Sequence, residues 1–541
     1  MKIPSRQSPA WRTGQRPKAY TVSILPRYTS QRWHSVLQNR SYDDAINTLN
    51  TLQTTYAELT RRRLAGIRFV PLANDHLRVC LSKVGYSQDD LTKLNIVHVA
   101  GTKGKGSTCA YVDSMLSQYR HIHSIPQNIG LFTSPHLIAV RERIKINSTP
   151  ISCSLFAKYF FEIYDALRDF EKPVYFKFLV LMSYHVFIQQ GVDVAIYEAG
   201  VGGEYDATNI VDCPAVTGIS RLGIDHTFQL GETVEEIAWH KAGIQKFGVP
   251  SFSVTQLKGA LEVLGKVASE RKVKNFEVKG WNERLRGVRV RPDAEFQYEN
   301  ASLAVALTES VLGKLDPGFK RAPDEPLSKE LKDGIEKVVW RGRFEVKREG
   351  NITWYLDGAH TSDSIQFATK WYSEETSKKF SDTNHAGRTG TRVLVFNQQG
   401  HREAMELLET LSNSVREGKI PRFDHVIFAP TVLSQQQDLK KGNVSFALIE
   451  DHKADKLQLD FVNKQHDGDA IAKLTLQTSF AAKWSDLNGE TDSQIKVVPS
   501  IPDAFDYIRD LTDGNGIEVF VTGSIHLVGT VLSALEGVDA L

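Results

Sequence analysis

The stretch Asn95-Ile-Val-His-Val-Ala-Gly-Thr-Lys-Gly-Lys-Gly-Ser-Thr108 decides the fold of this chain. Its first six residues are mostly apolar, partly β-branched and bounded by glycine, which predicts a short buried strand. A glycine-rich turn follows, and the pattern from about Thr108 to Ser117 predicts a helix. Such a junction points backbone N–H groups and a helix N-terminus at an anion. The stretch therefore predicts a phosphate-binding turn.

The amino-acid sequence of this turn departs from the usual P-loop pattern. Gly106 separates Lys105 from the hydroxyl residue Ser107, and Val99 stands five residues before Gly104, where the pattern has glycine. A purely structural strand-to-helix turn is therefore the alternative. The strand and the helix on its two sides favour nucleotide binding, with Lys105 reaching the terminal phosphates.

Strand and helix patterns alternate along the rest of the chain. Further buried strands are expected at 193–197, 215–220, 354–356, 393–396, 425–429 and 518–522. Helical patterns lie between them, among them one from Tyr42 to about Leu64. This alternation predicts an α/β fold in which helices cover both faces of a mostly parallel sheet.

A Pro- and Gly-containing segment within 313–326 marks the best domain boundary. We expect an N-terminal P-loop-type ATPase domain over 43–315, a linker over 316–330, and a smaller C-terminal Rossmann-like α/β domain over 331–541. Two polar segments without a clear pattern, 373–391 and 431–495, are expected to be surface insertions.

The composition excludes several classes of protein. Of the 541 residues, 41% are hydrophobic and 24% charged, as in an average soluble globular protein. No apolar run reaches the roughly 18 residues of a membrane-spanning helix. The four cysteines form no CxxC pair, so neither a disulfide framework nor a zinc knuckle is indicated, and a reducing compartment is expected.

The charge is unevenly distributed along the chain. Eight of the 66 Lys and Arg residues and none of the 64 Asp and Glu residues lie in 1–42, which leaves 58 basic against 64 acidic residues in the remainder. A basic, acid-free, Ser-containing N-terminus is typical of a mitochondrial transit peptide. A basic arm without a targeting role is the alternative, and the acidic remainder gives no support to nucleic-acid binding.

Several polar side chains follow predicted strands or lie in an apolar helix. They are Ser134, Glu198, His226 and Lys241 in the first half, and Arg343 and Asp357 in the second. Glu198 ends a predicted strand before a run of glycines, where open α/β sheets bind ligands and a carboxylate suits Mg²⁺. Arg343 and Asp357 would complete a nucleotide site from across a cleft. Each of the six also has a structural explanation: a Ser-Pro turn, a solvated carboxylate, a loop histidine, a snorkelling lysine or a surface ion pair.

Taken in order, these motifs resemble the folylpolyglutamate synthase family of Mur-ligase-like enzymes, and the resemblance runs from Tyr42 to near Gly537. The motifs that carry it are His98 to Thr108, Phe132-Thr-Ser-Pro-His136, Gly202-Gly203 with Tyr205-Asp206 and Thr208-Asn209, Leu222-Gly-Ile-Asp-His226, Asp357-Gly-Ala-His360 and Thr522-Gly-Ser-Ile-His-Leu527. Six motifs in one order are far more specific than any one of them.

The resemblance implies a role for each site residue. Gly104, Lys105, Gly106 and Ser107 would bind the ATP phosphates, and Asn300, Arg343 and Asp357 would contact the nucleotide. Ser134, Glu198 and His226 would ligate Mg²⁺, a carbamylated Lys241 would ligate a second Mg²⁺, and His360 would lie near the reacting groups. Lys105, Lys241 and His360 are thus the implied catalytic residues. Phe296 stands where the family has histidine, so the adenine-side contacts differ.

The implied activity is ATP-dependent addition of L-glutamate to the terminal carboxylate of a tetrahydrofolate, through an acyl phosphate. Dihydrofolate synthase, which adds the first glutamate to dihydropteroate, and a P-loop ATPase without ligase activity are the alternatives. The expected ligands are ATP, two Mg²⁺ ions, folate and L-glutamate, with a monovalent cation as a further candidate. We expect a monomer located in the mitochondrion, with the cytoplasm as a second location.

Overall fold

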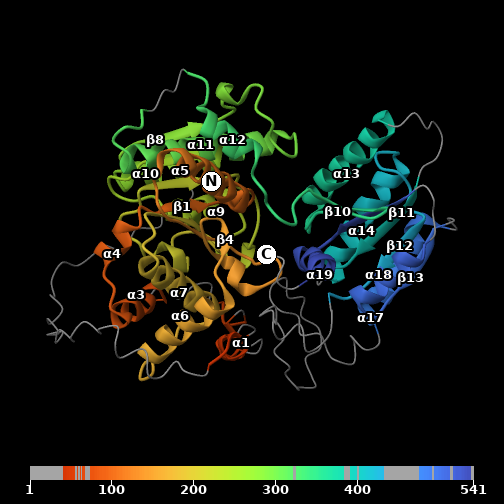
Figure 1. Ribbon diagram of the computed structural model, residues 1–541, viewed down its shortest axis with the longest axis horizontal. Helices are drawn as coiled ribbons and strands as arrows, with labels where there is room; N and C mark the ends of the chain where they lie inside the picture. The colour runs from red at the N-terminus through yellow and green to blue at the C-terminus, as the bar shows by residue number, and fades with distance from the viewer. Residues whose placement is uncertain are drawn as a thin grey trace, which may run out of the picture. The chain divides into compact units, whose positions relative to one another are not determined.

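Two β-sheets, each with its own set of helices, organise the chain (Figure 1). The computed structural model describes residues 40–54, 58, 61–62, 64–66, 73–320, 325–382, 390–398, 401–431, 474–489, 493–511 and 516–537. The expected transit peptide, apart from its last three residues, lies outside the described residues.

The first sheet has eight strands in the order β4-β3-β2-β5-β1-β6-β7-β8, with β1 near the centre. β2, β5, β1, β6, β7 and β8 run parallel, whereas β3 and β4 form an antiparallel edge. The strands are β1 Val97–Ala100, β2 Ile129–Phe132, β3 Ile144–Ile146, β4 Thr149–Pro150, β5 Val194–Glu198, β6 Val216–Ile219, β7 Ser251–Val254 and β8 Phe276–Lys279.

The helices of this first half connect the strands and cover the sheet. They are α1 Tyr42–Thr51, α3 Ala73–Val84, α4 Gln88–Lys93, α5 Lys105–His123, α6 Cys153–Ala166, α7 Tyr175–Gln189, α8 Thr227–Leu230, α9 Val234–Ala242, α10 Lys258–Glu270, α11 Glu295–Leu315 and α12 Lys329–Glu336, with short 3-10 turns at Val140–Arg143, Ala207–Ile210 and Glu283–Leu285. All residues of β1 and β5 are buried, as the continuous apolar runs predict for central parallel strands.

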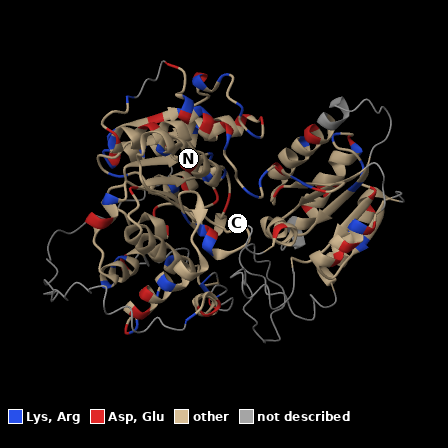
Figure 2. Ribbon diagram, in the orientation of Figure 1, with Lys and Arg blue, Asp and Glu red and all other residues tan. Residues whose placement is uncertain are grey.

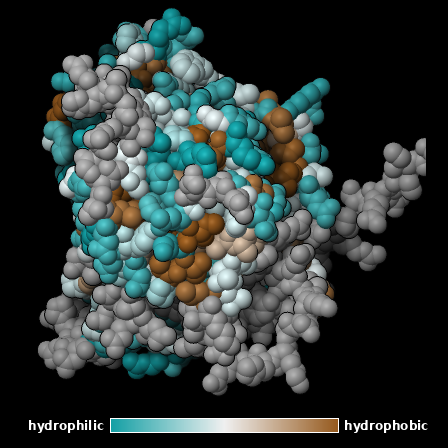
Figure 3. All heavy atoms as spheres, turned by 90° about the vertical axis from the view of Figure 1, so that its right-hand side faces the viewer, coloured by the Kyte–Doolittle hydropathy of each residue, from teal (hydrophilic) through white to brown (hydrophobic). Residues whose placement is uncertain are grey.

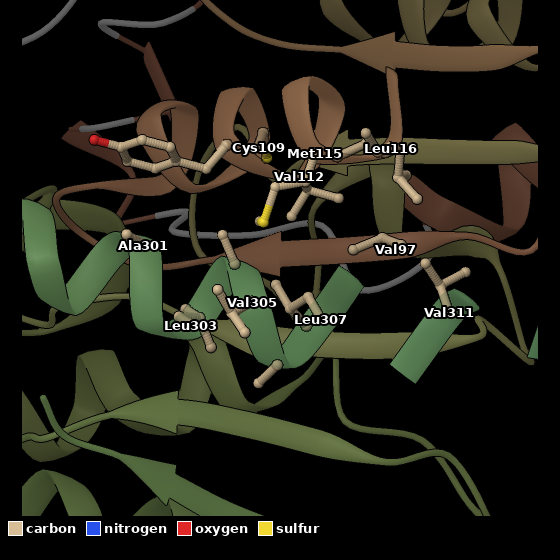
Figure 4. Packing of buried hydrophobic residues seen from close by; sticks show 14 of the residues in the cluster. Val97, Cys109, Val112, Met115, Leu116, Ala301, Leu303, Val305, Leu307 and Val311 are labelled. Carbon is tan, nitrogen blue, oxygen red and sulfur yellow. The ribbon is translucent and has the colours of Figure 1, made fainter. Parts of the chain in front are cut away.

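The main core of the first half lies where α5 and α11 pack against β1. Figure 4 shows Val112 and Met115 of α5 and Val305 of α11 pointing toward one another beside Val97 of β1. Because α5 begins directly after β1 and the glycine turn, this packing fixes the position of the helix N-terminus.

The second sheet has six strands in the order β13-β12-β11-β14-β10-β9, parallel except for β9. Its elements are β9 Glu345–Glu349, β10 Ile352–Leu356, α13 Ser362–Asp382, β11 Thr391–Phe396, α14 His401–Arg416, β12 His425–Phe428, α17 Thr475–Asn488, β13 Gln494–Val497, α18 Ile501–Asp510, β14 Ile517–Thr522 and α19 Ile525–Glu536. The predicted fold class, two α/β domains built on mostly parallel sheets, is confirmed.

The two predicted insertions are partly wrong. Residues 373–382 are the second half of α13, which follows the buried Trp371 and Tyr372. Residues 475–488 of the second segment form α17, whose Phe480 and Trp484 are buried in the core of the second sheet, and β13 begins at 494. Leu476, Phe480, Trp484 and Leu487 of α17 follow one another at helical spacing, so the sequence carried a helical pattern that its polar surroundings obscured. Residues 383–389 and 432–473 lie outside the described part.

Side chains from the first half pack into the core of the second. Leu137 and Ile138, which follow β2, belong to the buried cluster formed by β10, β14 and α19. Gly529 of α19 lies so close to the Leu137 carbonyl group that any side chain there would collide with it. This contact joins the loop after β2 to the second sheet.

The surface carries mixed charge and scattered apolar side chains. Acidic and basic residues are interspersed along the helices and loops (Figure 2). On the face drawn in Figure 3, hydrophobic surface forms separate patches among hydrophilic residues. Within the described residues, no helix is long and apolar enough to cross a membrane.

The contact between α12 and α5 gives a stability prediction. A Cβ atom at Gly334 of α12 would lie 2.5 Å from Cα of Met115, which is backbone and cannot rotate away. Gly334→Ala should therefore lower the free energy of unfolding by about 1–3 kcal/mol. Gly313→Ala is the matched control, because Gly313 of α11 has no such neighbour, and this change should stabilise the helix by about 0.5–1 kcal/mol. Urea unfolding of both variants measures the difference; equal effects would contradict the packing.

Candidate active site

The turn between β1 and α5 is shaped by two glycines and held by its neighbours. Gly101 has φ 154° and Gly104 has φ 86°, both in the region that favours glycine. A side chain at Gly104 would collide with the amide group of Asn300 on α11. The backbone N–H groups of Thr102 and Lys103 donate to the Arg221 carbonyl oxygen, at 2.9 and 3.1 Å. The turn is therefore held between α11 and the loop after β6.

Two lysine side chains converge on one carbonyl group in this turn. Lys105 Nζ donates to the Gly101 oxygen at 3.0 Å, and Lys241 Nζ donates to the same oxygen at 2.7 Å. Lys241 is only 2% exposed. Burial, followed by repulsion from Lys105, lowers the pKa of Lys241 to about 7. A substantial fraction of the Lys241 amine is therefore uncharged and nucleophilic at neutral pH.

Glu198 is the last residue of β5 and lies beside the turn. One of its carboxylate oxygens accepts the backbone N–H of Ser134 at 2.9 Å. Burial raises the pKa of Glu198, while the charges of Lys105 and Arg343 and the Ser134 N–H oppose the shift. The predicted pair Ser134 and Glu198 is thus in direct contact.

His226 is the residue directly before α8 and has the left-handed conformation, with φ 50°. Its imidazole Nε2 lies 3.7 Å from a carboxylate oxygen of Asp225. Burial lowers the pKa of His226, and Asp225 opposes this shift. A neutral imidazole is the form that ligates a metal ion.

The second sheet contributes Arg343, Asp357 and His360. Asp357 directly follows β10 and accepts the backbone N–H groups of Phe344 and Ala359, at 3.0 and 2.9 Å. Burial raises the pKa of Asp357 to about 6, although Arg343 opposes the shift.

The His360 ring is held by the loop that contains Asp357. Its Nδ1 lies 3.0 Å from the Gly358 carbonyl oxygen, so Nδ1 carries the proton and Nε2 remains an acceptor. Desolvation by the surrounding walls, followed by repulsion from Arg343, lowers the pKa of His360. The ring is therefore neutral at physiological pH.

One cavity of about 1430 Å³ brings these residues together. Its lining includes every predicted site residue except Lys241, namely Gly104, Lys105, Gly106, Ser107, Ser134, Glu198, His226, Asn300, Arg343, Asp357 and His360. Lys241 lies outside the lining, although its ammonium group meets Lys105 at the Gly101 carbonyl. Residues from both sheets thus surround a single space.

Four further residues of this region were not predicted as site residues from the sequence. The Trp340 ring lies 2.9 Å from the position of a Cβ atom at Gly106. Lys103 and Asp363 form a 2.9 Å ion pair between the turn and α13. His526, at the start of α19, has a pKa lowered to about 4 by burial, with Arg143 and His360 contributing. His526 lies in the motif Thr522 to Leu527, so the sequence indicated the segment but not the role of this residue.

Phe296 contributes an apolar wall where a histidine was expected. Its ring lies 4.8 Å from the ring of Phe367 on α13 and 6.3 Å from that of Phe344. Gln297 and Asn300, on the same helix, are joined by a 2.9 Å hydrogen bond between their amide groups. The side of the cavity next to α11 therefore combines an aromatic surface with amide groups.

A glycine turn at a helix N-terminus, with an arginine and an aspartate facing it from a second α/β domain, defines a two-domain nucleotide-dependent enzyme. Known relatives identify which one. The chain is 48% identical to a folylpolyglutamate synthase of Neurospora crassa over 518 residues, 93% of each chain, and 39% identical to one of Candida albicans over 528 residues, 92% of this chain and 96% of that one. The chain therefore belongs to the folylpolyglutamate synthase family. No protein-family model matches it.

Solved structures share the fold at lower sequence identity. The apo form of L. casei FPGS has a TM-score of 0.62 and 18% identity, and the match covers 92% of this chain and 100% of that one. E. coli FolC in complex with DHPP and ADP has a TM-score of 0.61 and 20% identity, and the match covers 92% of this chain and 98% of that one. A Mycobacterium tuberculosis folylpolyglutamate synthase complexed with ADP gives 0.61 and 20%. These likenesses support the two-domain fold.

The buried Lys241 amine makes stability depend on pH. Between pH 10.5 and about 7 the unfolded chain binds a proton at Lys241 that the folded chain does not, so this group destabilises the folded chain progressively as pH falls. Lys241→Met removes that penalty. The gain in unfolding free energy should be small at pH 10 and reach a few kcal/mol below pH 7, measured by urea unfolding in buffer free of CO₂ and divalent metal.

Lys158→Met is the control for this measurement, because Lys158 lies exposed on α6. Its effect on stability should not change with pH. A Lys241→Met gain that is equal at pH 10 and pH 6.5 would show that the amine is not buried as the structure has it.

Proposed function

We propose that this chain is an ATP-dependent ligase that adds L-glutamate to the terminal glutamate carboxylate of tetrahydrofolates. The observation that carries the proposal is one cavity in which Lys105 and the glycine turn face Arg343, Asp357 and His360 from the second sheet. Membership of the folylpolyglutamate synthase family supplies the substrate class.

The reaction must activate a carboxylate, which is a poor electrophile. A carboxylate oxygen of the folate attacks the γ-phosphorus of ATP, and the bond to the β-phosphate oxygen breaks, which gives ADP and an acyl phosphate. The amine of glutamate then attacks the acyl carbon, phosphate leaves with the original carboxylate oxygen, and the amine loses a proton. The products are ADP, phosphate and a folate longer by one glutamate.

Each residue of the cavity has a part in this sequence. The N–H groups of Gly106 and Ser107, with Lys105, hold the phosphates and offset the charge that develops during phosphoryl transfer. Arg343 approaches the same phosphates from the second sheet, and Asn300 and Asp357 contact the base and ribose. The free Nε2 of His360 takes the proton that the attacking amine releases.

The donor set beside the turn fits Mg²⁺. Among the described residues no group of three His, Cys, Asp or Glu side chains is placed to hold a metal ion. Mg²⁺ commonly takes only one or two carboxylates from a protein, with water and substrate phosphates as its other ligands. Glu198, Ser134 and His226 would hold one ion, which supplies charge neutralisation for the phosphates.

The Lys241 amine suits the carbamylation that the second Mg²⁺ requires. A neutral amine reacts with CO₂, and its lowered pKa supplies that form at neutral pH. The carbamate would replace a buried cation by an anion next to Lys105, which removes a repulsion. A monovalent cation remains a further candidate ligand, and a monomer is the proposed state.

The two alternative activities differ from folate polyglutamylation in the acceptor that they need. Dihydrofolate synthase uses dihydropteroate, and a P-loop ATPase without ligase activity needs no acceptor. The segment Val140–Ile144 and the helical region near residues 45–63 favour the polyglutamylating enzyme. The test measures incorporation of labelled glutamate in the presence of ATP with tetrahydrofolate, with dihydropteroate, or with neither acceptor. Labelled product should form with tetrahydrofolate. Incorporation with dihydropteroate only, or hydrolysis without an acceptor, would refute the proposal.

Lys105→Ala should abolish this incorporation, by a factor of about 100 or more, because one phosphate-binding cation is lost from the transition state. Its circular dichroism spectrum and unfolding midpoint should stay close to those of the wild type. Lys93→Ala is the control, since Lys93 is an exposed lysine just before β1 that pairs with Asp90 on the surface. Near-wild-type turnover in Lys105→Ala would contradict the role of the turn.

We also propose that the N-terminal segment directs the chain to the mitochondrion, with a cytoplasmic fraction. The support is the charge asymmetry of residues 1–42. Residues 1–45 fused to a fluorescent protein should co-localise with a mitochondrial stain, and replacement of the eight basic residues by glutamine should abolish this. A diffuse signal from the unaltered fusion would contradict the targeting.

A further inference from the structure

The active-site cavity continues well beyond the phosphate-binding turn. Its lining follows α5 from Lys105 at the N-terminus to His121 near the C-terminus. Sixteen residues of helix correspond to about 24 Å. The opposite wall is formed by the β3–β4 edge, through Lys145 and Thr149, and by the segment after α12. We call this extension the α5 branch.

Trp340 stands where the α5 branch meets the turn. Its ring faces Gly106 on one side, and Lys145 Nζ lies 5.7 Å from the ring centroid. A ligand that extends from the reacting carboxylate along α5 therefore passes Trp340 and Lys145.

The basic groups of the α5 branch are available to a ligand. Lys145 forms no hydrogen bond or ion pair with any described residue and is partly buried. Lys337 is 58% exposed and pairs with Asp333 at 2.9 Å on the surface. Arg120 and His121 lie farther along the lining, where Arg120 Nε donates to the Gln127 carbonyl oxygen at 2.6 Å.

The acidic groups of the branch, by contrast, already have partners. Glu142 accepts the backbone N–H groups of Leu137, Ile138 and Ala139. Asp113 is buried and accepts the hydroxyl of Ser148 at 2.6 Å. The groups left to interact with a ligand are therefore mainly cationic.

We propose that the α5 branch binds the γ-linked glutamate tail of the folate substrate. Each glutamate within such a tail keeps one free α-carboxylate, so the tail is a regular polyanion whose charge grows with every cycle. Lys145 takes the α-carboxylate of the glutamate that precedes the reacting one, and Lys337, Arg120 and His121 take those that follow. The inference rests on the proposed function and specifies how the same site accommodates a lengthening acceptor.

The proposed site is tested by varying the number of glutamates in the acceptor. With tetrahydropteroyl mono-, tri- and pentaglutamate as acceptors, Lys145→Gln should change KM for the monoglutamate less than twofold. It should raise KM for the tri- and pentaglutamate by roughly five- to tenfold, because only these carry a carboxylate at Lys145. KM for ATP should change less than twofold. Lys145→Arg keeps the charge and should restore most of the long-chain affinity.

Lys279→Gln is the matched control. Lys279 lies on β8 of the same sheet and above an aromatic ring, that of Phe252, as Lys145 lies above that of Trp340, but it is outside the cavity. This variant should match the wild type at every tail length. Equal KM increases at all lengths in Lys145→Gln, or no increase at any length, would overturn the inference.

A binding measurement separates this inference from the proposed activity. Penta-γ-glutamate without a pterin should bind the wild-type chain in calorimetry, and Lys145→Gln should bind it at least fivefold more weakly. Failure of this binding in a wild type that incorporates glutamate refutes the tail site alone. Binding in a chain that incorporates no glutamate supports the site and refutes the activity.

Discussion

The carbonyl group of Gly101 is the point on which the active site depends. Two ammonium groups, from Lys105 and Lys241, share this one acceptor although they repel each other. The arrangement persists because β1, α5 and α9 are fixed by their own cores, so the side chains have little freedom to separate. The cost of burying the second charge falls on Lys241, whose pKa drops to about 7. A buried lysine thereby becomes a reactive amine next to a phosphate-binding turn.

The division of the site between two sheets follows from the chemistry of an acyl phosphate. Such an intermediate is lost if water reaches it before the amine does, so the reacting groups need walls on all sides. The turn supplies one wall, and Arg343, Asp357 and His360 supply the other. Leu137 and Ile138 anchor the loop that contains Ser134 in the core of the second sheet, so the position of Ser134, a residue of the first half, depends on the second. The Lys103–Asp363 ion pair adds a contact at the exposed edge.

The fold was predictable where local pattern and burial agree. The short apolar strands at 193–197 and 215–220 form β5 and β6, and Glu198 ends its strand as expected. The first helix, predicted to extend to about Leu64, ends at Thr51, and Leu52 forms its C-terminal cap. The helix α17 was missed although Leu476, Phe480, Trp484 and Leu487 lie at helical spacing, because long polar stretches surround it.

The residue types of the site could be predicted from the sequence, but the contacts between these residues could not. The bond from Lys241 to Gly101 joins residues 140 positions apart, and the pKa of the lysine is a property of that tertiary contact. The same holds for Trp340, which touches the turn only because α12 packs on α5 and places the following segment there. Sequence motifs identify the side chains that can take part in the reaction, and tertiary packing determines which of them are in contact.

The most direct test of the central claim follows one oxygen atom. Folate labelled with ¹⁸O in its terminal carboxylate is converted with ATP and L-glutamate, and the released phosphate is analysed by mass spectrometry. Activation as an acyl phosphate transfers one ¹⁸O atom to phosphate for each glutamate added. Phosphate that carries no label while the folate gains glutamate would contradict the proposed reaction at this site.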